Sequence, residues 1–332
     1  MKKIFITGSE GFIGSHLIED LVKNNYSVKG LVQYNSFNNW GWIDTMPKKI
    51  LKEVELVHGD IRDADFIRNN LNNVKCVLNL AALIGIPYSY HAPSSYFNTN
   101  VMGLMNILNA CKDKNISIIH TSTSEVYGTA IKIPIDENHP LQAQSPYSAS
   151  KISADQLALS YFNSFDMDIK IIRPFNTFGP RQSLRAVIPS IITQLSEKNK
   201  KLNIGSITPT RDLTYIDDTV RAFRYAINNS KIIGQVINLG TGYEISIKNL
   251  INLIAEIMGI KNLKIKEQKN RLRPKKSEVF RLVSNNNKAK EFLGWTPNYS
   301  KKSGLKKGLI KTVEWYLDSK NIINFKKDIY NL

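Results

Sequence analysis

Five residues in the middle of the chain could together transfer protons next to a redox cofactor. Tyr147 and Lys151 are four positions apart, so on a helix their side chains lie one turn apart on the same face. A free phenol has a pKa near ~10, and a neighbouring ammonium favours the phenolate and lowers that pKa toward the working range. Just upstream, Thr123, Ser124 and Glu125 place hydroxyls and one carboxylate where a strand should end. These residue types predict an acid–base site beside a hydride acceptor.

A glycine-rich turn near the N-terminus predicts where that acceptor binds. Residues 2–7 read as a short buried strand, and apolar residues at helical spacing follow the glycines. Gly8 permits the tight turn, Gly11 lets the backbone approach a pyrophosphate, and Gly14 allows the helix to pack closely on the strand. The helix N-terminus adds free N–H groups and the positive end of the helix dipole. The residues expected to bind a dinucleotide here are Gly8, Gly11, Phe12, Ile13 and Gly14.

Residues that follow the next strands should complete the cofactor site. A strand over 54–58 leads to Asp60, whose carboxylate could accept a hydrogen bond from an adenine amino group, while Ile61 could cover the ring. A helix N-cap formed by Asp60 or Asp63 explains the same residues equally well. A strand over 76–80 ends in a segment whose small residues leave room for the cofactor: Leu80, Ala81 and Ala82.

The end of the second strand, 27–32, leaves the choice between NAD and NADP open. An acidic residue at this point usually holds the ribose hydroxyls of NAD, and an arginine accommodates the 2′-phosphate of NADP. Val32 and Gln33 occupy the position, followed by Tyr34 and Asn35, so neither group is present. NAD is the expected cofactor, and NADP stays as the alternative.

The order of strands and helices predicts an α/β fold with a doubly wound parallel sheet of the Rossmann type. Residues 1–178 and 213–243 should form this dinucleotide-binding domain. Residues 179–212 and 244–332 alternate less regularly and should form a smaller mixed α/β domain for the substrate.

Composition excludes several other classes of protein. The net charge is +17, yet no nucleic-acid-binding motif accompanies it, so we expect no nucleic-acid partner. The charge is typical of a solvated surface, and part of it could serve a phosphate-bearing substrate. The longest apolar run, 77–86, is too short to span a bilayer, which predicts no membrane association and a cytoplasmic protein. The cysteines, Cys76 and Cys111, sit in apolar surroundings and should be buried thiols, and the five histidines lack ligand spacing. We expect no metal site.

The chain resembles the extended short-chain dehydrogenase/reductase family over its whole length. The resemblance rests on the glycine motif, on the Tyr147–Lys151 pair and on the stretch from Arg173 to Asn176. Residues 122–128 and 145–151 are similar to nucleotide-sugar 4,6-dehydratases. Residues 34–42, 86–90 and 271–278 resemble the N-acetylglucosamine 4,6-dehydratases of legionaminic acid biosynthesis.

This resemblance implies a role for each candidate residue. Tyr147 would take the proton of the C4 hydroxyl of UDP- or GDP-N-acetylglucosamine while hydride leaves C4, and Lys151 would lower the pKa of the phenol and hold the nicotinamide ribose. Thr123 would bind the C4 oxygen. Glu125 would remove the C5 proton before water leaves C6 and the hydride returns there, regenerating a cofactor that stays bound. The implied product is a 4-keto-6-deoxy sugar.

One departure and three alternative functions stand beside this interpretation. Deoxythymidine-diphosphate glucose dehydratases carry an aspartate where this chain has Ser124, so Ser124, Glu125 or water would protonate the leaving hydroxyl; GDP-mannose enzymes share Thr-Ser-Glu. A 4-epimerase or a UDP-glucuronate decarboxylase would keep the fold, although decarboxylases usually have an arginine where Ile152 follows the lysine. A non-catalytic dinucleotide-binding protein would not need the intact site.

Substrate contacts and assembly are also implied. The candidates for binding the diphosphate and nucleotide are mostly basic, because guanidinium binds phosphate through two hydrogen bonds: Asn176, Arg181, Arg185, Val187, Arg211 and Arg273. Helices over 100–112 and 148–165 resemble the pair that family members bury in a dimeric four-helix bundle, which predicts a homodimer. Their apolar positions could equally serve the internal core.

Overall fold

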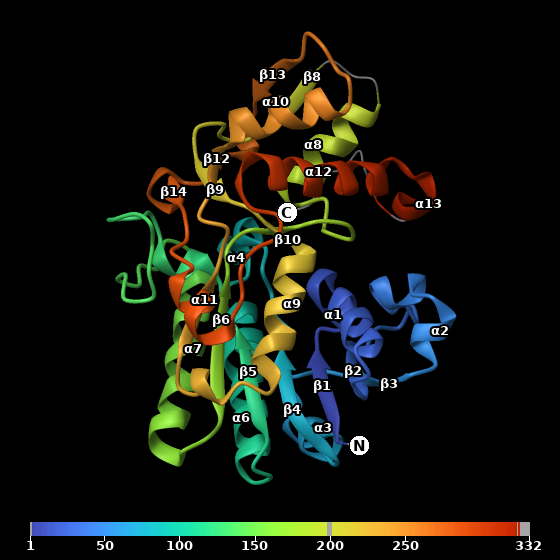
Figure 1. The fold of residues 1–332 in the computed structure, drawn as a ribbon, viewed down its shortest axis with the longest axis vertical. Coiled ribbons are helices and arrows are strands. Elements are labelled where there is room, and N and C mark those ends of the chain that lie inside the picture. Colours follow the sequence, from blue (N-terminus) through green and yellow to red (C-terminus); the bar gives the residue numbers. More distant parts are fainter. Residues whose placement is uncertain (1, 198–200, 324, 326–332) are drawn as a thin grey trace.

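A seven-stranded parallel sheet forms the centre of the computed structural model, which describes residues 2–197, 201–323 and 325 (Figure 1). The strand order is β11-β6-β5-β4-β1-β2-β3, and every neighbouring pair is parallel. The strands are β1 (Lys3–Thr7), β2 (Val28–Gln33), β3 (Val54–Gly59), β4 (Val74–Asn79), β5 (Ser117–Thr121), β6 (Ile169–Pro174) and β11 (Val236–Leu239). Except for the edge strand β3, they are largely buried on both faces, and they are rich in Val, Ile and Leu. The predicted doubly wound Rossmann sheet is confirmed.

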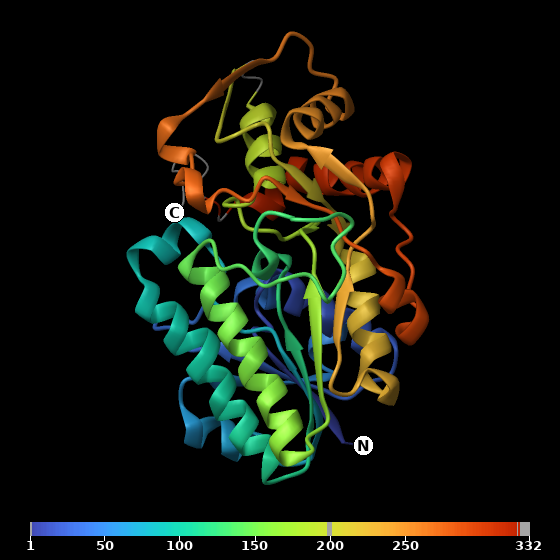
Figure 2. The ribbon, with the colours of Figure 1, turned by 90° about the vertical axis from the view of Figure 1, so that its left-hand side faces the viewer.

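Helices cover both faces of this sheet. One face carries α1 (Phe12–Lys23) and α9 (Ile216–Ile227), which pack against each other. The opposite face carries α3 (Ala64–Asn70), α6 (Gly103–Lys112) and α7 (Pro146–Phe165). Figure 2 shows α6 and α7 side by side on this face. Two hydrophobic cores result, one under each layer of helices, and the first continues into the C-terminal elements.

The C-terminal elements lie beyond the carboxyl ends of the strands (Figure 1). Three helices and two small sheets make up most of this region: α8 (Val187–Ser196), α10 (Ile247–Ile257), α12 (Lys301–Leu317), β8 (Lys201–Ile204) with β13 (Lys264–Glu267), and β9 (Thr210–Asp212) between β12 (Glu244–Ser246) and β14 (Arg281–Leu282). Shorter elements connect the whole: α2 (Lys48–Leu51), α4 (Ile86–His91), α5 (Pro93–Phe97), β7 (Thr177–Phe178), β10 (Thr214–Tyr215), α11 (Asn287–Leu293) and α13 (Ser319–Ile322). The mixed α/β character is as predicted, and the domain boundaries stay a prediction.

The strand order determines where a ligand can bind. The chain leaves β1 toward β2 on one side, whereas β4 lies on the other side of β1, so the order reverses between β1 and β4. In open α/β sheets ligands bind in the crevice at such a reversal, outside the carboxyl ends of the strands. The glycine turn follows β1 and the Thr-Ser-Glu segment follows β5, so both lie at this edge.

Other sequence expectations concern the core and the membrane. Cys76 and Cys111 are buried free thiols, as predicted, and burial raises the pKa of Cys76 to about 12. Within residues 2–197, 201–323 and 325, no helix has the length and apolar character needed to cross a membrane. In the same described residues, no group of acidic, histidine or cysteine side chains is arranged to hold a metal ion.

Candidate active site

The glycine turn after β1 is packed so closely that only glycine fits at two of its positions. Gly8 has φ +67°, and a Cβ added to it would lie 2.9 Å from the Cα of Ala81. A Cβ on Gly14 would lie 2.2 Å from the carbonyl oxygen of Gly8. Gly11 caps α1 without a side-chain hydrogen bond, so the first N–H groups of the helix are free to bind an anion. This open backbone cradle fits the pyrophosphate of a dinucleotide, with Phe12 starting the helix.

The segment after β4 is fixed next to this turn. The Thr7 hydroxyl accepts the N–H groups of Leu80, at 3.1 Å, and Ala81, at 3.0 Å. It also donates to Oδ1 of Asn79 at 2.8 Å. The predicted cofactor residues after β4 therefore lie against the glycine turn, and Ala82 continues the same segment.

Asp60 and Ile61 lie at the end of β3 with partners of their own. Asp60 accepts hydrogen bonds from the backbone and the guanidinium of Arg62, while Asp63 caps α3 by accepting the N–H of Phe66 at 2.9 Å. Of the two aspartates, the capping alternative therefore applies to Asp63. The side chain of Ile61 is buried in the core against Gly103, so covering an adenine ring with it stays a prediction that this packing does not favour.

Tyr147 and Lys151 are buried in the first turns of α7. Ser145 begins the helix through a capping box with Ser148, which fixes the direction in which α7 leaves the loop. Lys151 donates from Nζ to the carbonyl oxygen of Thr121 at 2.5 Å, and burial lowers its pKa to about 8. The pair is thus not a solvated surface pair.

The predicted lowering of the Tyr147 pKa is wrong for these side chains. Burial raises the pKa of Tyr147; the hydrogen bond with Thr123 opposes this only in part, and the Glu125 charge raises it further. Lys151 binds the Thr121 carbonyl at the end of β5, so its charge is directed there. Deprotonation of Tyr147 therefore requires a positive charge near the phenol that outweighs the effect of burial.

The Thr-Ser-Glu segment forms the turn after β5. Thr123 is extended and caps a single 3₁₀ turn, Ser124–Tyr127, by accepting the N–H of Glu125 at 3.2 Å. Ser124 is buried inside this turn. Glu125 is also buried, and its carboxylate faces the C-terminal region. The turn therefore places a hydroxyl next to Tyr147 and a carboxylate within the same site.

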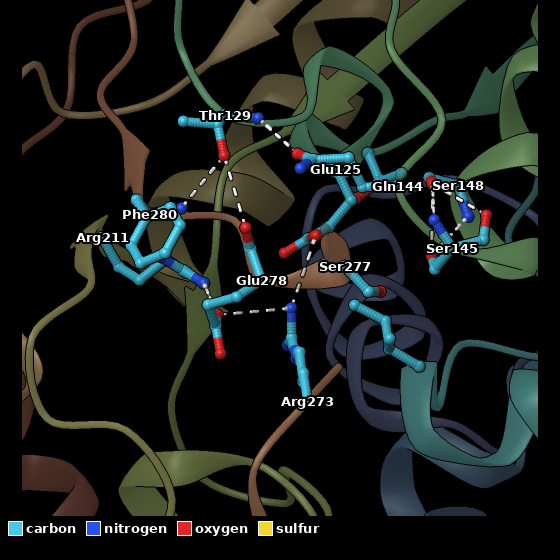
Figure 3. A network of polar contacts seen from close by, with 12 residues as sticks. Glu125, Thr129, Gln144, Ser145, Ser148, Arg211, Arg273, Ser277, Glu278 and Phe280 are labelled. Carbon is cyan, nitrogen blue, oxygen red and sulfur yellow. Dashed lines mark hydrogen bonds and ion pairs between the residues drawn. The ribbon is translucent and has the colours of Figure 1, made fainter. Parts of the chain in front are cut away.

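Two of the predicted arginines lie in this part of the site, and Figure 3 shows Arg273 directed to Glu125 and Arg211 directed to Glu278. Arg273 places Nη1 3.8 Å from Oε2 of Glu125 and 4.0 Å from Oε1 of Glu278. The buried Arg211 places Nη2 3.6 Å from the same oxygen of Glu278. Sequence reasoning missed Glu278, although this residue ends the stretch 271–278 that resembles N-acetylglucosamine 4,6-dehydratases.

The remaining substrate candidates are placed differently. Asn176 follows β6, and its buried Oδ1 has no hydrogen-bond partner within the described chain, so it is available to a ligand. Arg181 is ion-paired with Glu19 of α1, and Arg185 donates from Nε to Ser183 at 3.2 Å. Val187 is the first residue of α8. Of this set, Arg273 lies within ion-pair distance of Glu125, and Arg211 interacts with Glu125 electrostatically.

A cluster of polar side chains is buried beneath the site, and the sequence analysis missed it. Asp155 lies one turn beyond Lys151 on α7 and accepts hydrogen bonds at Oδ2 from Ser122 at 2.6 Å and from Arg173 at 2.8 and 3.1 Å. Nε2 of His120 lies 3.5 Å from Oδ1. Burial raises the pKa of Asp155, but His120 and Arg173 outweigh it, and the pKa falls to about 2. An acidic residue at helical spacing from Lys151 was the signal available.

Comparisons with known proteins agree with this geometry. The family model described as GDP-mannose 4,6 dehydratase matches residues 5–308. A putative UDP-glucose 4-epimerase of Methanocaldococcus jannaschii is 31% identical over 94% of this chain and 97% of its own. The dTDP-D-glucose 4,6-dehydratase of Homo sapiens is 30% identical over 98% and 92%. The crystal structure of the dTDP-glucose 4,6-dehydratase DesIV from Streptomyces venezuelae, with NAD bound, has a TM-score of 0.84 at 27% identity and covers 96% of this chain and 98% of its own.

Proposed function

The chain belongs to the nucleotide-sugar dehydratase and epimerase family of extended short-chain dehydrogenases/reductases, and from this premise we propose that it is a 4,6-dehydratase. The proposed substrate is UDP- or GDP-N-acetylglucosamine, and the product its 4-keto-6-deoxy derivative. We further propose that NAD is the tightly bound cofactor, since the glycine cradle fits a dinucleotide and a related dehydratase has been solved with NAD.

The side chains divide the proton transfers between them. When bound beside Tyr147, a nicotinamide supplies the redox chemistry, by taking up hydrogen from C4 of the sugar and returning it to C6. Once a nearby positive charge has converted it to the phenolate, Tyr147 accepts the proton of the C4 hydroxyl, and the Thr123 hydroxyl orients that oxygen. Lys151 holds the nicotinamide ribose from the end of β5, where its ammonium already bonds the Thr121 carbonyl.

Dehydration also needs a base that removes the C5 proton, and we assign this role to Glu125. A ketone at C4 acidifies the C5 proton, and a carboxylate within reach can remove it. The same proton, or one from water, can then be delivered to the hydroxyl that leaves C6. Ser124 is buried in the 3₁₀ turn, which favours Glu125 or water for this step.

The observation that carries the proposal is a buried carboxylate, Glu125, in the same turn as Thr123 and beside Tyr147. The test is mass spectrometry of reactions with a panel of UDP- and GDP-hexoses. A product lighter by one water from the N-acetylglucosamine derivative supports the proposal, and Glu125→Gln should abolish that product while the protein still folds. Failure with every nucleotide hexose would contradict it.

A 4-epimerase is the second candidate, favoured by the similarity to the Methanocaldococcus jannaschii relative. Epimerisation needs Tyr147 and Thr123 but no carboxylate at C5, so its product would have unchanged mass and Glu125→Gln would affect it little. Decarboxylation of UDP-glucuronate is separated from both reactions by the release of carbon dioxide.

Substrate contacts and assembly complete the proposal. Arg211, Arg273 and Asn176 bind the diphosphate and sugar, with Arg185 and Val187 contributing from the start of α8. A homodimer forms through α6 and α7; Phe165, the last residue of α7, and Met102, just before α6, are exposed. Light scattering at micromolar concentration tests the dimer. A cytoplasmic location and a role in legionaminic acid biosynthesis also belong to this proposal.

A further inference from the structure

The fold brings a carboxylate to the end of β2, although the strand itself has no acidic residue at that end. Oε1 of Glu10, the residue before the second glycine of the turn, accepts the backbone N–H of Gln33 at 3.0 Å. Gln33 is the last residue of β2, the position from which an acidic side chain normally holds the adenine ribose. The glycine turn thus delivers to this point the charge that the strand lacks.

Backbone contacts on both sides hold Glu10 in this position. Ser9 donates from its hydroxyl to the Leu31 carbonyl at 2.6 Å, which ties the turn to β2. The N–H of Trp42 donates to the Glu10 carbonyl at 3.0 Å, which ties the segment after β2 back to the turn. Gly41 has φ +57°, and a Cβ on it would lie 2.8 Å from that carbonyl oxygen. These contacts fix the backbone of Glu10 beside the end of β2, from which its carboxylate reaches the N–H of Gln33.

The second carboxylate oxygen is unused. Oε2 of Glu10 is buried and has no hydrogen-bond partner within the described part of the chain. Among the described residues no lysine, arginine or histidine forms an ion pair with Glu10. A buried carboxylate oxygen without a donor is costly, and a ligand hydroxyl would satisfy it.

We propose that Glu10 binds the adenine-ribose hydroxyls of the dinucleotide and thereby selects NAD over NADP. The inference rests on the proposed dinucleotide and adds the residue that discriminates. A ribose 2′-hydroxyl donates a hydrogen bond to Oε2, whereas a 2′-phosphate would place like charge against an unneutralised carboxylate.

An arginine that follows the neighbouring strand already has an ion-pair partner. Arg62 follows β3, the strand paired with β2, and could in principle accommodate a 2′-phosphate. Its guanidinium instead bonds both carboxylate oxygens of Asp60. Arg62 therefore provides the matched control: it is a charged residue near the proposed ribose site that we do not expect to affect the preference for NAD over NADP.

The test measures dissociation constants of NAD and NADP by calorimetry on the full chain freed of bound nucleotide. The wild type should bind NAD more tightly. Glu10→Gln keeps an oxygen for the Gln33 N–H but removes the charge, so the ratio of the NADP to the NAD dissociation constant should fall about tenfold or more. Glu10→Asp keeps the charge and should retain the preference for NAD, and Arg62→Gln should leave the ratio unchanged.

Each outcome decides a different claim. Wild-type protein that binds both dinucleotides equally, or a ratio unchanged in Glu10→Gln, would overturn the role of Glu10 while leaving the proposed enzyme intact. Loss of the preference in Arg62→Gln would assign the discrimination to Arg62 instead. Protein that binds neither dinucleotide would overturn the proposed function, and this inference with it. Competition with adenosine 2′,5′-bisphosphate and with 5′-AMP repeats the comparison, because these two compounds differ only in the 2′-phosphate on the ribose.

Discussion

Two clusters of oppositely charged side chains adjoin the proposed catalytic tyrosine, and they are built differently. The buried cluster consists of Ser122, His120, Asp155 and Arg173. The substrate-side cluster consists of Glu125, Arg211, Arg273 and Glu278. Hydrogen bonds to Asp155 in the first are 2.6 to 3.1 Å long, whereas the ion pairs of the second are 3.6 to 4.0 Å long.

This difference indicates that the same residue types have different roles in the two clusters. Asp155 joins the ends of β5 and β6 to α7 through short bonds, so it fixes the segment that carries Thr123 and Lys151. Long ion pairs satisfy less of the hydrogen-bonding capacity of a guanidinium, and Nη1 of Arg273 has no hydrogen-bond partner within the described residues. Such a group remains able to bind a phosphate. We therefore interpret the buried cluster as structural and the substrate-side cluster as ligand-binding.

The largest effect is expected at Tyr147, which lies between the clusters. Tyr147→Phe removes the proton acceptor while the ring keeps its packing against Tyr96, so activity should fall by about 10²- to 10⁴-fold without loss of folding. Steady-state kinetics and circular dichroism measure the two quantities. The matched control is Tyr161→Phe on the same helix, which loses only a hydrogen bond to Asn109. Equal activities of the two variants would contradict the catalytic role.

A loss of stability is expected from Asp155→Asn. Removing one partner of a buried ion pair leaves the charge of Arg173 uncompensated, which costs about 3–5 kcal/mol. Urea denaturation monitored by circular dichroism measures the free energy of unfolding. Asp166→Asn, at the exposed C-cap of the same helix, should change that free energy by no more than about 0.5 kcal/mol. A change at Asp155 as small as at Asp166 would show that the buried cluster is not structural.

The smallest of these effects is expected from Arg273→Gln. This substitution should weaken substrate binding rather than lower the stability of the fold. Losing one charged hydrogen bond to the diphosphate should raise KM about tenfold or more, with the free energy of unfolding little changed. Arg281→Gln is the control, because its guanidinium pairs with Glu244 away from the site. If Arg273→Gln instead destabilised the protein and left KM unchanged, the distinction between the two clusters would fail.

Local signals explain why most of the fold could be predicted. The seven strands are short runs rich in apolar residues, and α1, α6 and α9 carry apolar residues at helical spacing, so these elements are specified by their own residues. The glycine positions and the Tyr147–Lys151 spacing likewise lie within single segments. Contacts between segments carry no such signal. Asp155 with Arg173, Glu278 with Arg211, and Glu10 with Gln33 join residues from different elements.

By itself the sequence determined a parallel α/β sheet, a dinucleotide turn and the chemical types of the proposed acid–base residues, because these depend on residues near one another in the chain. Only the tertiary structure decided their environments. Burial raises the pKa of Tyr147 and lowers that of Lys151, and the glycine turn brings a carboxylate to the end of a strand that has none. Desolvation and charge pairing depend on distances in space, and those distances are set by how the elements pack.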